Sequence, residues 1–178
     1  MKAFAMFLCG ASLMPATLFA QAASDGRRDF DWEIGKWRTE VRVLLAPGRW
    51  AEFVGTSDVV PLWDGDANVV HLAVEGASGR IEGVSLRLYD SASGQWSLNY
   101  ANRRTGKLSP PVYGGFRDGR GVFHGQDWID GRAVLVRFII YDVTPTSARF
   151  EQSISFDGGE NWEPNWIATD RRLPAPER

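Results

Sequence analysis

Hydrophobic and polar side chains alternate along most of this chain with the period of a β-strand, in which successive side chains point to opposite faces. The alternation is clearest in the segment 37–45. Uncharged side chains fall on one face, at Trp37, Thr39, Val41, Val43 and Leu45. Charged side chains fall on the other face, at Arg38, Glu40 and Arg42. We therefore predict a strand that has one buried and one exposed face.

Similar short runs follow along the rest of the chain, and turn-forming residues separate nearly all of them. The runs are 50–60, 68–75, 80–89, 95–102, 121–129, 132–143, 147–156 and 161–169. Because no helical pattern lies between them, these strands predict an all-β domain whose antiparallel meander becomes a barrel or a sandwich. The longest irregular stretch, 103–113, contains Pro110 and Pro111 and is a candidate functional loop or a flexible rim.

A short helical turn is predicted before the first strand. Phe30, Ile34 and Trp37 have the spacing of one helical face, and Gly35 is placed to end the turn. The segment Gly35-Lys36-Trp37 resembles the Gly-x-Trp opening of calycins such as lipocalins. This resemblance implies that the helical turn closes one end of a barrel and that the Trp packs inside.

The same folds place an Arg near the end of the last strand, across from that Trp. Arg171 or Arg172 occupies the corresponding place, and we assign the role to Arg171. Such a contact would close the barrel by a cation–π interaction.

Two longer motifs, 29–37 (DFDWEIGKW) and 155–166 (SFDGGENWEPNW), lie at the start of the first predicted strand and near the end of the chain. They resemble a family of bacterial calycin-like proteins that is catalogued as a domain of unknown function. The resemblance implies an antiparallel up-and-down β-barrel of about ten strands. It brings no substrate, cofactor or catalytic residue.

The run Ser155-x-Asp157-Gly158-Gly159-x-x-Trp162 also resembles the Asp-box hairpin of sialidase-type propellers. Propellers repeat that motif in every blade, whereas this chain has a single copy. We therefore assign a structural role here: Asp157 and Gly158 suit a type I′ turn, and Trp162 is expected to cover it.

Several predicted strands carry aromatic and amide side chains at every second position, and therefore on one face. Such a mixture is typical of the wall of a ligand cavity. The cavity candidates are Trp96, Tyr100, His124, Gln126, Trp128 and Gln152. The alternative is a solid core, in which buried Trp and Tyr bond to neighbouring Gln and His.

Sequence motifs for catalysis or metal binding are not evident. The chain has no Gly-x-Ser-x-Gly elbow, phosphate loop, dinucleotide fingerprint or His-Glu-x-x-His helix. Its two histidines, His71 and His124, fall on separate predicted strands, and we assign neither a metal nor a cofactor to them. Arg137 and Glu151 have outward parity and are expected to form a cross-strand ion pair.

The first 22 residues have the pattern of a removed signal peptide. Lys2 precedes an apolar stretch, and Ala20-Gln21-Ala22 offers a small-x-small cleavage site. The apolar stretch is too short to span a bilayer, so the mature chain is expected to have no membrane span. It also contains Cys9, the only cysteine, so the mature chain can form no disulfide. We predict an exported protein, periplasmic or secreted, with residues 23–178 forming one domain.

Charge and composition bear on the function. The formal net charge is −2, and acidic and basic residues are interspersed, which argues against nucleic acid as a partner. Our first hypothesis is the binding of a small apolar or aromatic molecule in a barrel cavity. The alternatives are a small cofactor-independent enzyme of the cyclase, isomerase or hydrolase type with His124 as acid or base, and a partner-binding surface module. The oligomeric state is left open.

Overall fold

The computed structural model describes residues 25–174. The predicted signal peptide, with Cys9, lies outside the described residues. Within them, no helix is long and apolar enough to cross a membrane. The strands are β1 (Gly35–Ala46), β2 (Arg49–Leu62), β3 (Ala67–Gly76), β4 (Gly79–Asp90), β5 (Gln95–Asn102), β6 (Lys107–Leu108), β7 (Val112–Arg117), β8 (Arg120–Ile129), β9 (Arg132–Tyr141), β10 (Ser147–Ser155) and β11 (Glu163–Arg172). Three short 3-10 turns, η1 (Gly26–Arg28), η2 (Asp31–Glu33) and η3 (Trp63–Gly65), complete the elements.

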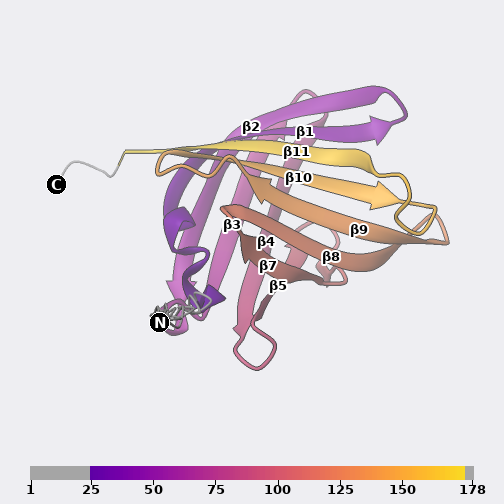
Figure 1. The fold of residues 1–178 in the computed structure, drawn as a ribbon. Coiled ribbons are helices and arrows are strands. Elements are labelled where there is room, and N and C mark those ends of the chain that lie inside the picture. The colour runs from indigo at the N-terminus through magenta and orange to yellow at the C-terminus, as the bar shows by residue number, and fades with distance from the viewer. Residues whose placement is uncertain (1–24, 175–178) are drawn as a thin grey trace, which may run out of the picture.

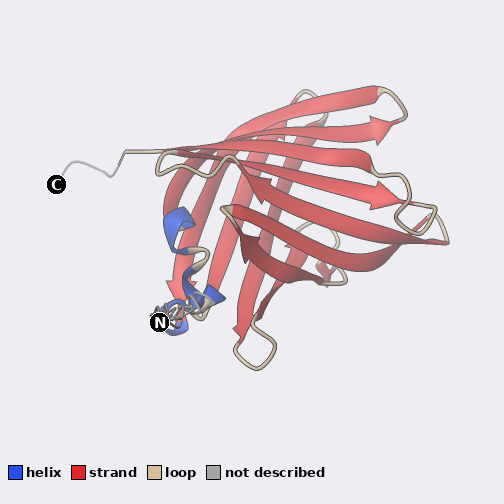
Figure 2. Cartoon of the chain, in the orientation of Figure 1, coloured by secondary structure: helices blue, strands red, loops and turns tan. Residues whose placement is uncertain are grey.

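The strands form a closed antiparallel barrel (Figure 1), which confirms the predicted fold class. Consecutive strands pair along the chain, and the first strand, β1, pairs with the last, β11. Ten strands take part in the ring, because β5 pairs with both β4 and β7, whereas the two-residue β6 pairs only with β5. The helical turns η1 and η2 lie together at one end of the barrel (Figure 2), which we call the closed end.

Strand β1 shows the predicted alternation. Trp37, Thr39 and Val41 are buried, whereas the charged residues between them are exposed. The alternation fails at Leu45, which is exposed because the register with β2 shifts between Leu44 and Ala46. The buried parity of β1 therefore holds until this irregularity near its end.

The closed end has the predicted helical turn, but its arginine is not the predicted one. Gly35 adopts a φ of 123°, which only glycine takes easily, and Trp37 is fully buried at the start of β1. The guanidinium carbon of Arg172 lies 4.1 Å from the centre of the Trp37 ring. Arg171 is exposed instead, so our assignment to Arg171 is wrong. The pairing of Trp37 with Arg172 in the register of β1 and β11 decides between the two neighbours.

The segment 103–113 is only partly irregular. Its end enters β7, a strand that the sequence pattern did not reveal, since Gly114 and Gly115 interrupt the alternation of side chains. Gly114 is needed there: a Cβ on it would lie 2.0 Å from the carbonyl oxygen of Val122 on the neighbouring β8. The strand was missed because two residues without side chains carry no hydrophobic period.

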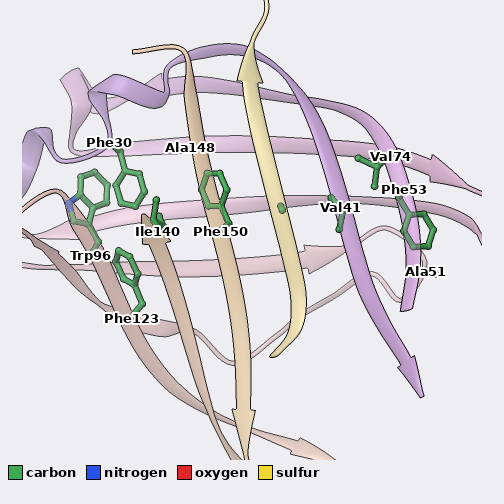
Figure 3. Close-up of a cluster of buried hydrophobic side chains, with 11 residues drawn as sticks. Phe30, Val41, Ala51, Phe53, Val74, Trp96, Phe123, Ile140, Ala148 and Phe150 are labelled. Carbon is green, nitrogen blue, oxygen red and sulfur yellow. The ribbon is translucent and has the colours of Figure 1, made fainter. Parts of the chain in front are cut away.

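The apolar core is concentrated in two places along the barrel (Figure 3). At the closed end, Phe30 packs edge-on against Trp96, with ring centres 4.9 Å apart, and against Phe116 at 5.2 Å. Away from it, Val41 and Phe53 gather on β1 and β2. The cavity lies in the interior between them, where further apolar side chains such as Leu72, Leu98 and Phe138 are joined by polar ones.

Candidate ligand-binding cavity

A cavity of about 400 Å³ occupies the barrel interior. Much of its wall is apolar, formed by Val70, Leu72, Leu98, Val112, Val136 and Phe138. Ser109 and Pro110, in the segment between β6 and β7, also line it and are exposed, so the cavity reaches the surface there. This volume falls within the range of about 300–1,000 Å³ that small-molecule sites occupy.

A buried ion pair lies where the cavity meets the closed end. Glu33 comes from η2 and Arg87 from β4, and their side chains are only 2% and 5% exposed. Both terminal nitrogens of Arg87 donate to the Glu33 carboxylate, with Nη2 3.1 Å from Oε1. The guanidinium also lies over the ring of Phe30, 4.3 Å from its centre. The helical turn therefore places a carboxylate where it can neutralise a buried arginine.

Asp170 on β11 lies at the same end and lines the cavity. It is 3% exposed, and its Oδ1 is buried without a hydrogen-bond partner within the described part of the chain. Burial and the negative charge of Glu33 raise the pKa of Asp170, while a hydrogen bond from Thr39 and the charge of Arg87 lower it, and the result is a pKa of about 7. Asp170 is therefore partly protonated near neutral pH, unlike an ordinary aspartate.

Two hydroxyl groups continue this polar region across the sheet. Thr39 on β1 lies directly opposite Asp170 in the register of β1 and β11. Its Oγ1 is 2.7 Å from Oγ of Ser57 on β2, and both residues line the cavity. Side chains from three adjacent strands thus form one polar row. We call Glu33, Arg87, Asp170, Thr39 and Ser57 the polar floor.

Two of the predicted cavity residues, Tyr100 and Gln152, line the cavity and do not belong to the polar floor. Burial raises the pKa of the Tyr100 hydroxyl, and a hydrogen bond with Asn102 opposes this shift. Gln152 donates from Nε2 to Oδ1 of Asn165 at 3.1 Å. Trp96 also points inward, but it belongs to the aromatic cluster of the closed end, where its Nε1 donates to the carbonyl oxygen of Gly26 at 2.7 Å. The prediction of Trp96 as a cavity residue is therefore wrong.

The three candidates on β8 lie on the outside of the barrel. His124 and Gln126 are exposed, and Trp128 is 71% exposed. The side chains of β8 that face inward include Phe123, which packs against Phe30 at the closed end, and Asp127, which lines the cavity. The prediction of an inward face for His124, Gln126 and Trp128 is therefore wrong, because packing at the closed end fixes the opposite parity.

His124 belongs to an outer aromatic surface, which we define as His124, Trp128, Arg137 and Trp162. The ring centres of His124 and Trp162 are 6.2 Å apart, and the guanidinium carbon of Arg137 lies 4.4 Å from the Trp162 ring. Arg137 is outward as expected, but it lies opposite Ser153 in the register of β9 and β10. Within residues 25–174, the expected ion pair between Arg137 and Glu151 is not formed.

The loop between β10 and β11 is held by Asp157. Its carboxylate accepts hydrogen bonds from the backbone N–H and the side-chain amide of Asn161 and from the Ser155 hydroxyl, and these hold its pKa well below the usual range. Positive φ angles occur at Gly158 (77°) and Gly159 (99°), one residue later than a type I′ turn centred on Asp157 and Gly158 requires. The predicted type I′ turn at Asp157 and Gly158 is therefore wrong, and the Asp157 carboxylate holds the loop together by its hydrogen bonds.

The remaining histidine, His71, faces outward on β3, where its Nε2 is 3.4 Å from Oε1 of Glu82. Among the described residues, no group of three or more His, Cys, Asp or Glu side chains is placed to hold a metal ion.

The polar floor was missed by the sequence analysis. Arg87 lies between Leu86 and Leu88, and an alternating pattern of this kind would place the leucines inside and the arginine outside. Asp170 follows the last expected strand, which we ended at Thr169. A usable signal was present in Glu33, because it lies within the helical turn that was expected to close the barrel.

Comparison with known proteins supports the fold. No family model matches the sequence, and no curated protein matches it. An S-type phycobiliprotein lyase from Guillardia theta, CPES, has a similar structure, with a TM-score of 0.57 and 14% identity over 85% of this chain and 96% of that chain. A de novo designed fluorescence-activating β-barrel gives a TM-score of 0.45 and 13% identity over 80% of this chain and 95% of that chain. Membership of the bacterial calycin-like family stays a prediction, and the likeness to the lyase shows that the two chains share a β-barrel fold.

Proposed function

We propose that this protein is an exported barrel that binds one small, mostly apolar molecule in its cavity. The observation that carries the proposal is the cavity of about 400 Å³, which has apolar walls and a polar floor at one end. Ligand sites combine apolar lining with a few convergent polar groups in this way. A barrel that only needed a stable core would gain from filling this space, since unfilled volume forfeits packing contacts.

The polar floor gives a second reason for a binding role. Replacing a buried ion pair by apolar residues is often neutral or stabilising, so Glu33 and Arg87 are a poor choice for stability alone. Asp170, a buried carboxyl group with an unpaired oxygen, also costs stability. Groups of this kind collect at functional sites, where they orient a ligand.

Binding is tested with two variants on neighbouring positions of β4. Ser85 lines the cavity, whereas Val84 is exposed on the outside. Ser85→Trp should fill part of the cavity and weaken binding of the neutral dye Nile red about tenfold or more, while Val84→Trp should bind as the wild type does. Dye fluorescence titrations measure both. Equal binding by the two variants, with both folded by circular dichroism, would place the dye outside the cavity and contradict the proposal.

Export is tested separately, since it depends on residues 1–22. We expect the mature protein to begin at Ala23 and to occur in the periplasm or the medium. Mass spectrometry of the protein from separated cell fractions measures both properties. An intact chain that begins at Met1 and stays in the cytosol would contradict export and leave the binding proposal standing.

The two alternative functions have less support. The enzyme hypothesis relied on His124, whose exposed position on the outer face keeps it from reaching a ligand in the cavity. The surface-module hypothesis relied on exposed tryptophans near Trp32, Trp63 or the segment 103–113. Trp63 on η3 is exposed, whereas Trp32 is partly buried against Trp37. Nothing in the described residues joins Trp63 to a second exposed tryptophan in one docking site.

A further inference from the structure

We infer that the polar floor recognises a protonated amine, so that the ligand is an apolar molecule with one ammonium group directed at Asp170. The inference deepens the proposed function and rests on it. It starts from the Asp170 Oδ1 atom, which is buried, lines the cavity and has no hydrogen-bond partner among the described residues. A buried acceptor without a donor is costly, and a ligand that supplies the donor removes this cost.

The terminal nitrogens of the arginines at this end are already engaged. Both terminal nitrogens of Arg87 donate to Glu33. Arg172, the next inward residue of β11 after Asp170, donates to the carbonyl oxygens of Pro145, Ile34 and Trp32 and lies over Trp37. Asp170 is therefore left for a partner that the protein itself does not supply.

The charge of the cavity selects the sign of that partner. The charged side chains that line it are three carboxyl groups, Glu33, Asp127 and Asp170, and one guanidinium, Arg87. Because Arg87 is neutralised by Glu33, Asp170 is the carboxyl group at the floor that is left without a counter-charge. An ionised Asp170 in this buried position attracts a cation and repels an anion.

The neighbours of Asp170 suit an ammonium group in particular. An ammonium has three N–H donors and no acceptor. Asp170 Oδ1 can accept one of them, and the hydroxyl oxygens of Thr39 and Ser57, which are in contact with each other, can accept others. The apolar walls then contact the rest of the ligand.

Amine binding should also be linked to a proton. The groups facing Asp170 are Glu33 on η2, Arg87 on β4 and Thr39 on β1. Burial and Glu33 raise the pKa of Asp170 to about 7, and an adjacent ammonium lowers it again. Binding therefore releases a proton below neutral pH, so the affinity for the amine rises with pH and levels off above about 7.

Three probes with one aromatic body test the inference: 1-naphthylmethylamine, 1-naphthalenemethanol and 1-naphthoate. We expect the wild type at pH 8 to bind the amine about tenfold or more tightly than the alcohol, which is the effect of one charge-assisted hydrogen bond, and to bind the carboxylate most weakly. Isothermal titration calorimetry in buffers of different ionisation enthalpy measures the affinity and the released proton.

Asp170→Asn should remove both the preference for the amine and its pH dependence while keeping the affinity for the alcohol. Asp142→Asn is the matched control, since Asp142 is an exposed acid and its loss changes the net charge equally. This control should keep the preference of the wild type. The pH profile of the wild type gives a second readout that needs no variant.

Several outcomes would overturn the inference and leave the proposed function intact. Equal affinity for the amine and the alcohol would overturn it, provided that Ser85→Trp weakens the binding of both and so places them in the cavity. Tightest binding of the carboxylate would assign recognition to Arg87, whose Nε is also buried without a partner in the described residues. Binding of none of the three probes, with Nile red still bound, would also reject the amine. Failure of Nile red as well would contradict the proposed function itself.

Discussion

The closed end and the outer aromatic surface of this barrel are made from the same kinds of side chain in different surroundings. At the closed end Arg87 lies over Phe30 and Arg172 over Trp37, whereas on the outside Arg137 lies over Trp162. Inside, each arginine also has hydrogen-bonding partners, Glu33 for Arg87 and backbone carbonyls for Arg172. Burial makes the carboxylate partner of Arg87 necessary, since a guanidinium charge that is removed from water is costly when no counter-charge accompanies it.

This contrast means that similar contacts should differ greatly in their effect on stability. The contact between Arg137 and Trp162, two half-buried side chains at the barrel surface, should contribute about 0.5–1 kcal/mol. Breaking a buried ion pair by removing one partner costs about 3–5 kcal/mol, because it leaves an uncompensated charge. The closed end should therefore dominate the free energy of unfolding, and the outer aromatic surface should contribute little to it.

The largest effect is expected from Glu33→Gln, which leaves Arg87 buried without a carboxylate. We expect the free energy of unfolding to fall by about 3–5 kcal/mol, measured by urea denaturation. Lys36→Gln is a control on an exposed ion pair, that of Lys36 with Asp58, and should cost less than about 1 kcal/mol. A cost for Glu33→Gln as small as that of the control would show that the floor is open to water.

The next effect concerns Asp170 and depends on pH. At about pH 3 and below, the carboxyl group is protonated in both states. Between pH 4 and 7 the unfolded chain loses this proton while the folded chain keeps it, so the wild type loses stability as pH rises. Asp170→Asn cannot titrate, so its stability relative to the wild type should increase by up to about 4 kcal/mol from pH 3 to pH 8.

Urea denaturation of both proteins across this pH range measures the difference, and other titrating groups cancel in it. A difference that stays constant with pH would mean that the pKa of Asp170 is ordinary. It would also remove the proton linkage expected for amine binding.

A smaller effect should separate Arg172 from Arg171. Arg172→Ala removes hydrogen bonds to the carbonyl oxygens of Pro145, Ile34 and Trp32 together with the contact on Trp37, and should cost about 2–3 kcal/mol. Arg171→Ala, on an exposed side chain, should stay within about 0.5 kcal/mol of the wild type. Thermal unfolding of the two variants compares them directly, and similar losses would argue against Arg172 as the residue that closes the barrel.

The smallest effect is expected on the outer aromatic surface. Arg137→Ala removes the contact with Trp162 and should lower the free energy of unfolding by about 0.5–1 kcal/mol. Urea denaturation measures it, and the binding of Nile red should not change. A loss as large as that of Arg172→Ala would erase the contrast between the two regions.

Much of the fold could be predicted because its signals are local. The alternation of β1 holds from Trp37 to Val43, and the helical turn before Gly35 ends where the sequence indicates. These features depend on neighbouring residues, whose side-chain directions are set by the backbone period. The strand β7 was not predicted, because Gly114 and Gly115 have no side chains and so show no alternation of hydrophobic and polar residues.

The candidate site was harder to predict, because it depends on which face of each strand turns inward. On β8 both parities contain apolar residues, Val122 and Trp128 on one and Phe123 and Ile129 on the other. When either face of a strand could turn inward, its tertiary contacts decide the orientation. Here the contact of Phe123 with Phe30 decides it. Tyr100 and Gln152 do line the cavity, since their strands carry a clearer apolar face.

The sequence by itself determined an antiparallel barrel with a helical turn at one end, since strand period, turn residues and the Gly-x-Trp opening are all local. Only the tertiary structure decided that Glu33, Arg87 and Asp170 meet at its floor. These residues come from η2, β4 and β11, and the closure of β1 onto β11 brings the last of them to the other two. Charged residues on separate elements are buried next to one another only when the ring of strands closes. No pattern along the chain predicts that contact.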